Sequence, residues 1–299
     1  MRVAAFLSAL VAGLASFPPA AAATSSPVSA WYVYGSSPSE VASNAYTRGC
    51  AFARNQPGGG MRLLLLDFGA ARKLNSDTWG TIDFSNTTLS NPNILRALEA
   101  AADGYHDCHV RGSADILYGN SNYHLSASGM SGTDAWYAGY YQSKRAEDLS
   151  DYQVANGYDS QTSDAASDME PSWDGAAITK QLVNGDFAQG WALYYDFGSA
   201  DGCPQSGSSD GPCNNGWHVR DVGYVSYHGL AFPLPEIYYT VNADQWTVVR
   251  RLWNANQGGY TFAGVTATTG AGLAPGAAWN TLDSLNGGLV DSEIVCFGC

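Results

Sequence analysis

The stretch RLLLLDFG, residues 62–69, is an unbroken apolar run that ends in the carboxylate Asp67. A strand with one face in water alternates apolar and polar residues, whereas a run without alternation is typical of a strand buried on both faces. Strands of that kind occur in parallel sheets that are covered by helices. The run therefore predicts an α/β protein with a parallel sheet.

The rest of the chain repeats this arrangement of strand and helix. Strand-like segments occur at 31–35, 62–69, 115–122, 164–170, 191–198, 235–240, 260–267 and 292–298. Helix-like segments lie between them at 36–55, 91–104, 133–149, 175–185, 216–229, 242–256 and 277–288. This alternation predicts a (β/α)8 barrel of the TIM type, whose last βα unit can be incomplete. An open doubly wound parallel sheet is the alternative, although WYVYGSSPSE is not a phosphate-binding loop.

The N-terminus has the composition of an export signal. Met1 and Arg2 precede the apolar run VAAFLSALVAGLASF, and small residues follow up to Ala23. This pattern predicts a signal peptide over residues 1–23 and a single barrel domain over 24–299, in a secreted, extracellular protein. An uncleaved membrane anchor is the alternative, and no later segment is long enough to span a membrane.

The chain carries a formal net charge of −13. Such a protein is repelled by nucleic acid and by anionic membranes, so we expect neither as a partner. The acidity also fits a simple requirement for solubility, and we expect a monomer.

Six cysteines in an exported chain predict three disulfides, although six cysteines allow fifteen pairings. The turn-rich loop between Cys203 and Cys213 can close locally. The simplest completion pairs Cys50 with Cys108 and Cys296 with Cys299. Two alternatives are a redox role for CFGC at 296–299 and a zinc ligand set in HDCH at 106–109.

Polar residues gather where the predicted strands end. In a barrel enzyme the active site lies at the carboxyl ends of the strands. The candidate site residues there are Asp67, Asn120, Asn122, Asp168, Glu170, Tyr195, Asp196 and Tyr239. Polar residues are common where a strand ends and a loop begins, and this alone explains any one of these residues. It explains less well why two acids lie on the same face of one strand.

Asp168 and Glu170 lie two residues apart, so on a strand they face the same space. Two such carboxylates do not both ionise freely near neutral pH, and one keeps a proton that it can donate. Cleavage of a glycosidic bond needs such a donor and a negative group beside it. We therefore expect Glu170, with its longer side chain, to be the acid. Asp168 then stabilises charge or orients a 2-acetamido group, with Asp67 and Asp196 as auxiliary acids.

Aromatic side chains are abundant, with 18 Tyr and 9 Trp. Flat aromatic faces pack against sugar rings, which makes Trp173, Tyr195 and Tyr239 candidate substrate-binding residues. Packing in the core is the alternative for each of them.

The segment DME, residues 168–170, resembles the Asp-x-Glu motif of secreted barrel glycosidases. It is most similar to that of the family 25 glycoside hydrolases, which are muramidases, and their glycoside-hydrolase-like relatives. The resemblance implies a barrel, export, and Glu170 as proton donor beside Asp168. The early-strand acid of that family is matched by Asp67, which falls on the second predicted strand. The family 18 chitinase pattern fails, because Ser163 and Ala166 occupy its first two acidic positions.

Two hypotheses of function follow. The first is a secreted glycoside hydrolase that cleaves a cell-wall or environmental polysaccharide, with a polysaccharide or peptidoglycan-type glycan as its partner. The second is a barrel that binds a glycan without cleaving it. A metal-dependent hydrolase using Asp67, Asp168 and a histidine is a third alternative, but the chain has no H-x-H or H-E-x-x-H motif. We expect no metal and no cofactor.

Overall fold

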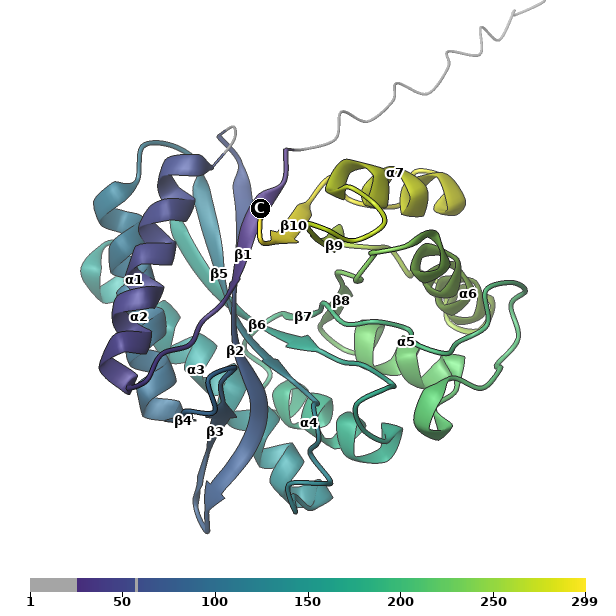
Figure 1. The fold of residues 1–299 in the computed structure, drawn as a ribbon, viewed down its shortest axis with the longest axis horizontal. Helices are drawn as coiled ribbons and strands as arrows, with labels where there is room; N and C mark the ends of the chain where they lie inside the picture. The colour runs from purple at the N-terminus through teal and green to yellow at the C-terminus, as the bar shows by residue number, and fades with distance from the viewer. Residues whose placement is uncertain (1–25, 57–58) are drawn as a thin grey trace, which may run out of the picture.

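Eight parallel strands form the centre of the protein in the computed structural model, which describes residues 26–56 and 59–299. They pair in the order β8-β7-β6-β5-β2-β1-β10-β9 (Figure 1). Their bounds are β1 Val28–Tyr32, β2 Met61–Asn75, β5 Ser113–Ser121, β6 Gln161–Asp168, β7 Tyr194–Asp196, β8 Ala231–Pro233, β9 Val265–Thr268 and β10 Ile294–Phe297.

The first and last strands of that order meet and close the sheet. The chain after β8 forms a parallel bridge between Glu236 and Thr266 of β9. The Ala263 N–H donates to the Pro233 carbonyl over 2.8 Å, and the Ile237 N–H donates to the Thr266 carbonyl over 2.9 Å. The sheet is therefore a closed (β/α)8 barrel, as predicted, and the open doubly wound alternative is wrong.

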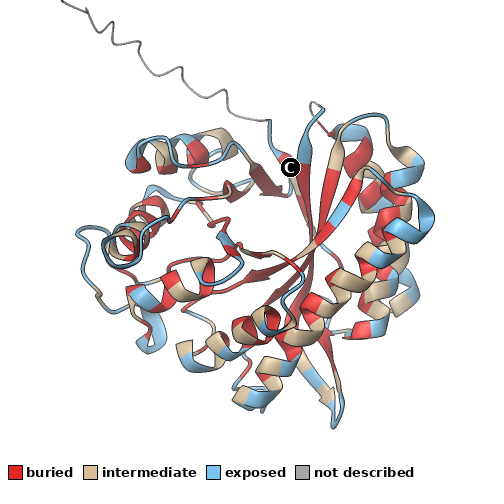
Figure 2. Ribbon diagram, turned by 180° about the vertical axis from the view of Figure 1, so that it is seen from behind, coloured by how far each residue is buried: buried red, intermediate tan, exposed pale blue. Residues whose placement is uncertain are grey.

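Seven α-helices connect successive strands in the described part of the chain. They are α1 Pro38–Asn55, α2 Asn91–Cys108, α3 Gly132–Asn156, α4 Ala176–Gln189, α5 Val219–Tyr227, α6 Thr240–Asn256 and α7 Pro275–Asn286, with a short 3-10 turn η1 at Asn214–Gly216. Residues 298 and 299, which follow β10, form no helix. The helices surround the strands and turn their buried sides toward them (Figure 2).

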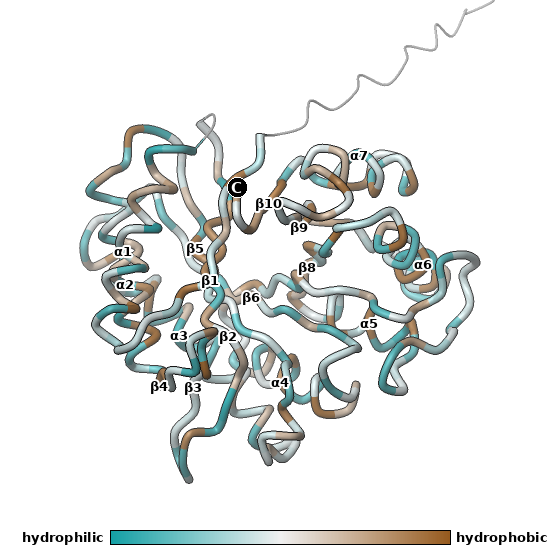
Figure 3. Tube along the Cα trace, in the orientation of Figure 1, coloured by the Kyte–Doolittle hydropathy of each residue, from teal (hydrophilic) through white to brown (hydrophobic). Residues whose placement is uncertain are grey.

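The hydropathy of the chain follows this arrangement. The apolar run RLLLLDFG, residues 62–69, lies in β2, where Leu64, Leu65 and Leu66 are fully buried. Hydrophobic segments gather along the strands and on the inner helix faces, and hydrophilic ones on the outside (Figure 3). A run without alternation is thus explained by a strand that contacts the barrel interior on one face and helices on the other.

A hairpin that the sequence analysis missed extends from the barrel after β2. This strand continues to Asn75 and pairs antiparallel with β3, Thr78–Ile82, which in turn pairs with β4, Thr88–Ser90. Gly69 marks the bend, with φ of +89°. A Cβ there would lie 2.4 Å from the Ile82 carbonyl oxygen. Only glycine allows this backbone conformation and this approach without strain.

The helices α3 and α4 cross in close backbone contact. A Cβ on Gly139 would lie 1.9 Å from the Leu182 carbonyl oxygen, and one on Gly185 would lie 1.8 Å from that of Trp136. A buried side-chain hydroxyl in β6 also ties the sheet to α3, since Ser163 donates to the Ala146 carbonyl over 2.8 Å. These contacts fix the helices that flank the strand carrying the acid pair.

All three predicted disulfides are present, and the described residues contain no free cysteine. Cys50–Cys108 joins α1 to α2, Cys203–Cys213 closes the loop after β7, and Cys296–Cys299 ties the end of the chain. The bonded state of Cys108 also argues against the zinc alternative for residues 106–109.

Two strands lie elsewhere than the sequence-based expectation placed them. The first strand ends at Tyr32 and not at residue 35, and β8 lies at Ala231–Pro233 instead of 235–240. The segment 235–239 forms no regular strand because Pro235 lacks an N–H and Tyr239 already caps α6, which begins at Thr240. Within the described residues no helix is long and apolar enough to cross a membrane. The predicted signal peptide, 1–23, lies outside the described residues.

Candidate functional site

A cavity of about 600 Å³ opens at the carboxyl ends of the strands, where a barrel enzyme carries its active site. Its walls come from β1, β2, the β3–β4 hairpin and the segments after β5, β6 and β8. The lining residues that carry functional groups are Tyr32, Asp67, Arg72, Asp83, Ser121, Tyr123, Asp168, Glu170, Trp173, Glu236 and Tyr238.

The acid pair faces this cavity. Asp168 is the last residue of β6, and Glu170 follows two residues later, before Pro171. Both side chains line the cavity although they are almost fully buried, with Asp168 6% and Glu170 8% exposed. Neither takes part in a salt bridge in the described part of the chain. The expectation that the two carboxyls share one space is thus met by the geometry.

A third acid, Glu236, lines the same cavity and was missed by the sequence analysis. It lies just after Pro235, in the segment whose backbone bridges to β9 and closes the barrel. The expected strand 235–240 placed Glu236 inside a strand and not at its end. A proline directly before an acid was the available signal, because proline favours the end of a strand over its middle.

Burial and mutual repulsion raise the pKa of each acid. The pKa of Glu170 is raised to about 9 by burial first, and then by the charges of Glu236, Asp201 and Asp196. The pKa of Asp168 is raised well above its ordinary value by burial, and next by the charge of Glu170. Because repulsion between two carboxylates is mutual, the pair holds a proton to higher pH than an isolated carboxyl does.

Two further acids of the cavity, Glu236 and Asp67, lose their protons at lower pH than Glu170. Burial raises the pKa of Glu236 to about 7, and a hydrogen bond from Tyr238 opposes that rise. Burial also raises the pKa of Asp67 to about 7, opposed by the hydrogen bond that its Oδ1 accepts from the Gly69 N–H. Near neutral pH, Glu236 and Asp67 therefore lose their protons before Glu170 does.

Two tyrosines, Tyr32 and Tyr238, line the cavity among these acids, and the sequence analysis missed both. The pKa of Tyr32 is raised by burial, and then by the charges of Asp67, Asp168, Glu236 and Glu170. Tyr32 stacks on Phe297 of β10, with ring centroids 4.4 Å apart. A neutral phenol amid several carboxyls can donate a hydrogen bond to one of them or to a ligand.

Two predicted site residues lie on the opposite face of the strands. Asn120 pairs in register with Ser167, and Ser167 pairs with Asp196, so all three belong to one row. The Ser167 hydroxyl donates to Asn120 over 2.7 Å, and it lies 3.3 Å from Gln142 of α3. This row faces the helices, whereas Asp168 belongs to the neighbouring row that faces the cavity. Asn120 and Asp196 therefore do not line the cavity.

Three other predicted residues lie beside the cavity without lining it. Asn122 is fully buried and bonds to the main chain of Glu170. Tyr195 lies inside the barrel with its ring 6.0 Å from that of Phe232, and Tyr239 is 54% exposed at the start of α6. Of the predicted set, the cavity brings together Asp67, Asp168, Glu170 and Trp173.

Aromatic side chains line the cavity beside the acids. Trp173 meets Tyr123 edge to face, with ring centroids 5.6 Å apart. Tyr32 meets Phe84, which follows β3, with ring centroids 4.4 Å apart. Phe84 is 52% exposed, so its ring is available to a ligand. A polar floor with aromatic sides is suited to a sugar, whose ring faces are apolar and whose edges carry hydroxyls.

A second cavity of about 540 Å³ lies between α4, α5 and α6, away from the strand ends. Its cations Lys180 and Arg220 form salt bridges with Asp221 and Asp210. We therefore place the candidate site at the first cavity. No group of three or more His, Cys, Asp or Glu side chains in residues 26–56 and 59–299 is arranged to hold a metal ion.

Comparisons with known proteins give the fold a broad context. No protein-family model and no curated protein matches the sequence. One similar solved structure is a GH18 chitinase from Pseudoalteromonas aurantia, with 12% identity over 90% of this chain and 93% of the other, and a TM-score of 0.44. A Rubisco-like protein from Rhodopseudomonas palustris has 11% identity over 93% of this chain and 60% of the other, with a TM-score of 0.37. Similarities this weak say nothing about the activity of this chain.

Proposed function

We propose that this protein is a secreted glycoside hydrolase that cleaves a cell-wall or environmental polysaccharide. The observation that carries the proposal is the placement of Asp168, Glu170 and Glu236 around one cavity at the carboxyl ends of the barrel strands. Hydrolysis of a glycosidic bond needs one carboxyl that is protonated and one that is charged at the same pH. The different pKa values of these acids supply both forms.

We assign the proton donor to Glu170, because its raised pKa keeps the proton near neutral pH. In the reaction this proton goes to the glycosidic oxygen as the bond to the anomeric carbon breaks. A water molecule adds its oxygen to that carbon and loses a proton to a carboxylate. The products are two shorter glycans, one with a new reducing end.

The charged partner is best supplied by Glu236, which ionises at lower pH than Glu170. A negative group beside the oxocarbenium-like transition state stabilises its positive charge. Asp168 lies deeper and holds its proton, so it can donate a hydrogen bond to the substrate. Asp67 is an auxiliary acid, and Asp196 supports the segment after β7 through its hydrogen bond from the Gly198 N–H.

The aromatic sides of the cavity position the sugar. Trp173 and Phe84 line the same cavity as the acids, and a contact of either ring with a sugar buries apolar surface of the sugar. Such positioning brings the scissile bond to Glu170 in a reactive arrangement. The same contacts would serve a barrel that only binds a glycan, so the acids and not the aromatics distinguish the two functions.

Export is part of the proposal. The N-terminal pattern predicts cleavage near Ala23, and three disulfides are typical of proteins from oxidising compartments. N-terminal sequencing of protein recovered from the medium of an expressing cell should give a start near Thr24. Retention of the whole product in the membrane fraction, with Met1 still attached, would contradict export.

The experiment that tests the activity is a screen of the mature protein against peptidoglycan, chitin, arabinan and β-glucans. We expect new reducing ends from at least one of them, and we expect Glu170→Gln to abolish the release. The substitution keeps the size of the side chain and removes only the proton that is donated. Glycan binding without release of reducing ends by the wild-type protein would favour the non-catalytic alternative.

A further inference from the structure

The cavity has an excess of acidic groups. Five carboxyls line it, those of Asp67, Asp83, Asp168, Glu170 and Glu236, against the single guanidinium of Arg72. The Nη1 of Arg72 already donates to two main-chain carbonyls, of Ala71 over 2.7 Å and of Tyr123 over 2.8 Å. This cation therefore holds the backbone of the cavity wall and is not free to pair with a negatively charged substrate.

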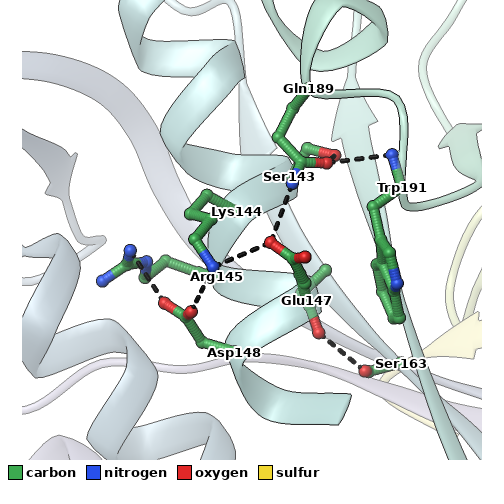
Figure 4. Close-up of polar contacts among 9 residues, drawn as sticks. Ser143, Lys144, Arg145, Glu147, Asp148, Ser163, Gln189 and Trp191 are labelled. Atoms are coloured by element: carbon green, nitrogen blue, oxygen red, sulfur yellow. Dashed lines mark hydrogen bonds and ion pairs between the residues drawn. The ribbon is translucent and has the colours of Figure 1, made fainter. Parts of the chain in front are cut away.

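The salt bridges of the described residues lie outside the cavity. None of the five cavity carboxyls forms a salt bridge within the described ranges. On the outer side of α3, by contrast, Lys144 pairs with Glu147 and Asp148, each over 2.7 Å, and Arg145 also pairs with Asp148 (Figure 4). The salt bridges of the described residues thus involve acids outside the cavity, and the five cavity carboxyls have no positive partner of this kind.

An unpartnered oxygen adds a second, independent observation. Asp168 is only 6% exposed, and its Oδ1 accepts no hydrogen bond. A buried carboxyl without partners is costly, and either a proton or a positively charged ligand relieves that cost. An ammonium group offers three N–H donors and a positive charge in one compact group, which suits several carboxyls that converge on one space.

We propose that the substrate of this site is a glycan with free amino groups, a polymer of cationic amino sugars. This inference rests on the proposed hydrolase function and specifies its substrate. The carboxylate of Glu236 pairs with the ammonium group, and the unpartnered Oδ1 of Asp168 accepts a hydrogen bond from it, while Trp173 and Phe84 contact the sugar rings. A ring face near a cation adds a further attraction. An acidic sugar is excluded from the same cavity by repulsion.

The test compares two pentamers that differ only at the C2 nitrogen: β-1,4-linked glucosamine and β-1,4-linked N-acetylglucosamine. Binding to the wild-type mature protein is followed at low temperature by tryptophan fluorescence near pH 7, where Glu236 is partly ionised and an amino group of the α-amino type is still largely protonated. We expect the glucosamine pentamer to bind at least about tenfold more tightly, as one additional charge contact allows. Added salt should weaken that binding and leave the acetylated pentamer nearly unaffected.

Two variants that each remove one carboxylate show where the preference for the glucosamine pentamer arises. Glu236→Gln removes a negative group from the cavity and should abolish most of the preference. Asp159→Asn removes one from the exposed segment between α3 and β6, which enters the opposite end of the barrel, and should leave the preference unchanged. If Glu236→Gln does not fold, as circular dichroism would reveal, the salt dependence of the wild-type protein decides alone.

The outcomes separate this inference from the proposed function. Equal binding of the two pentamers, tighter binding of the acetylated one, or binding of neither overturns the inference. Reducing-end release from another glycan would leave the hydrolase proposal standing in each of those cases. A clear preference for the glucosamine pentamer without any hydrolysis would support the cationic ligand and count against the enzyme.

Discussion

Asn122, at the end of β5, holds the main chain of Glu170 through both ends of its side-chain amide. Its Nδ2 donates to the Glu170 carbonyl over 3.0 Å, and its Oδ1 accepts from the Glu170 N–H over 3.1 Å. The same Nδ2 also lies 3.0 Å from the Thr179 hydroxyl of α4. A residue that contacts no cavity space thus sets the position of the proposed proton donor.

Replacement of this amide should cost both stability and rate. Asn122→Ala leaves two buried main-chain groups of Glu170 without partners, which costs on the order of 3 kcal/mol of unfolding free energy. We expect a lower kcat with a nearly unchanged KM, because the donor loses its position and the rest of the cavity is retained. Urea denaturation and steady-state kinetics measure the two effects. Asn156→Ala, on the exposed end of α3, is the matched control.

The repulsion between Glu170 and Glu236 should appear in the pH profile. Activity needs Glu170 protonated, so it should fall as pH rises through the pKa of that group, near 9. Glu236→Gln removes the charge that ranks first among those raising this pKa. The substitution should move the alkaline limb of kcat/KM to lower pH. An alkaline limb that stays in place in this variant would mean that repulsion by Glu236 does not hold the proton.

Stability should also depend on pH, through an acid outside the cavity. Asp196 is fully buried, and burial raises its pKa to about 8, far above the value of about 3.9 in an unfolded chain. The folded state therefore binds more protons than the unfolded state between these values. The resulting stability is complete below about pH 4 and is lost as pH rises through about 8.

The melting temperature should therefore fall between pH 5 and pH 8. Asp196→Asn keeps an oxygen that accepts the Gly198 N–H but does not titrate, so the fall should become less steep in this variant. Differential scanning calorimetry at several pH values checks both statements. Parallel curves for the variant and the wild-type protein would show that Asp196 does not cause the dependence.

The disulfides should differ in their contribution to stability. Cys50 and Cys108 are 58 residues apart and Cys203 and Cys213 are 10 apart, so the first bond restricts the unfolded chain more strongly. Loop-closure entropy predicts losses of about 4 and about 3 kcal/mol when each pair is replaced by serine. Thiol titration of the denatured, unreduced protein should find no free thiol. A larger loss from the Cys203–Cys213 replacement would indicate that local packing outweighs loop entropy.

The sequence by itself was sufficient for the fold and for part of the site. A run such as Leu63–Leu66 needs apolar surroundings on both faces, and its repetition with intervening helices allows few arrangements other than a parallel barrel. Cys203 and Cys213 are only 10 residues apart, so a short loop brings them together without help from the rest of the fold. The Asp168 and Glu170 side chains share a space because residues two apart on an extended chain point the same way.

Only the tertiary structure decided which other side chains reach the cavity. The side-chain direction alternates along a strand, so pairing register turns Asn120 and Asp196 toward the helices, and a strand as short as β7 carries no pattern that reveals this. Glu236 and Tyr32 are far apart in sequence and meet through closure of the barrel. A contact of this kind depends on long-range pairing and on burial, which no local pattern records.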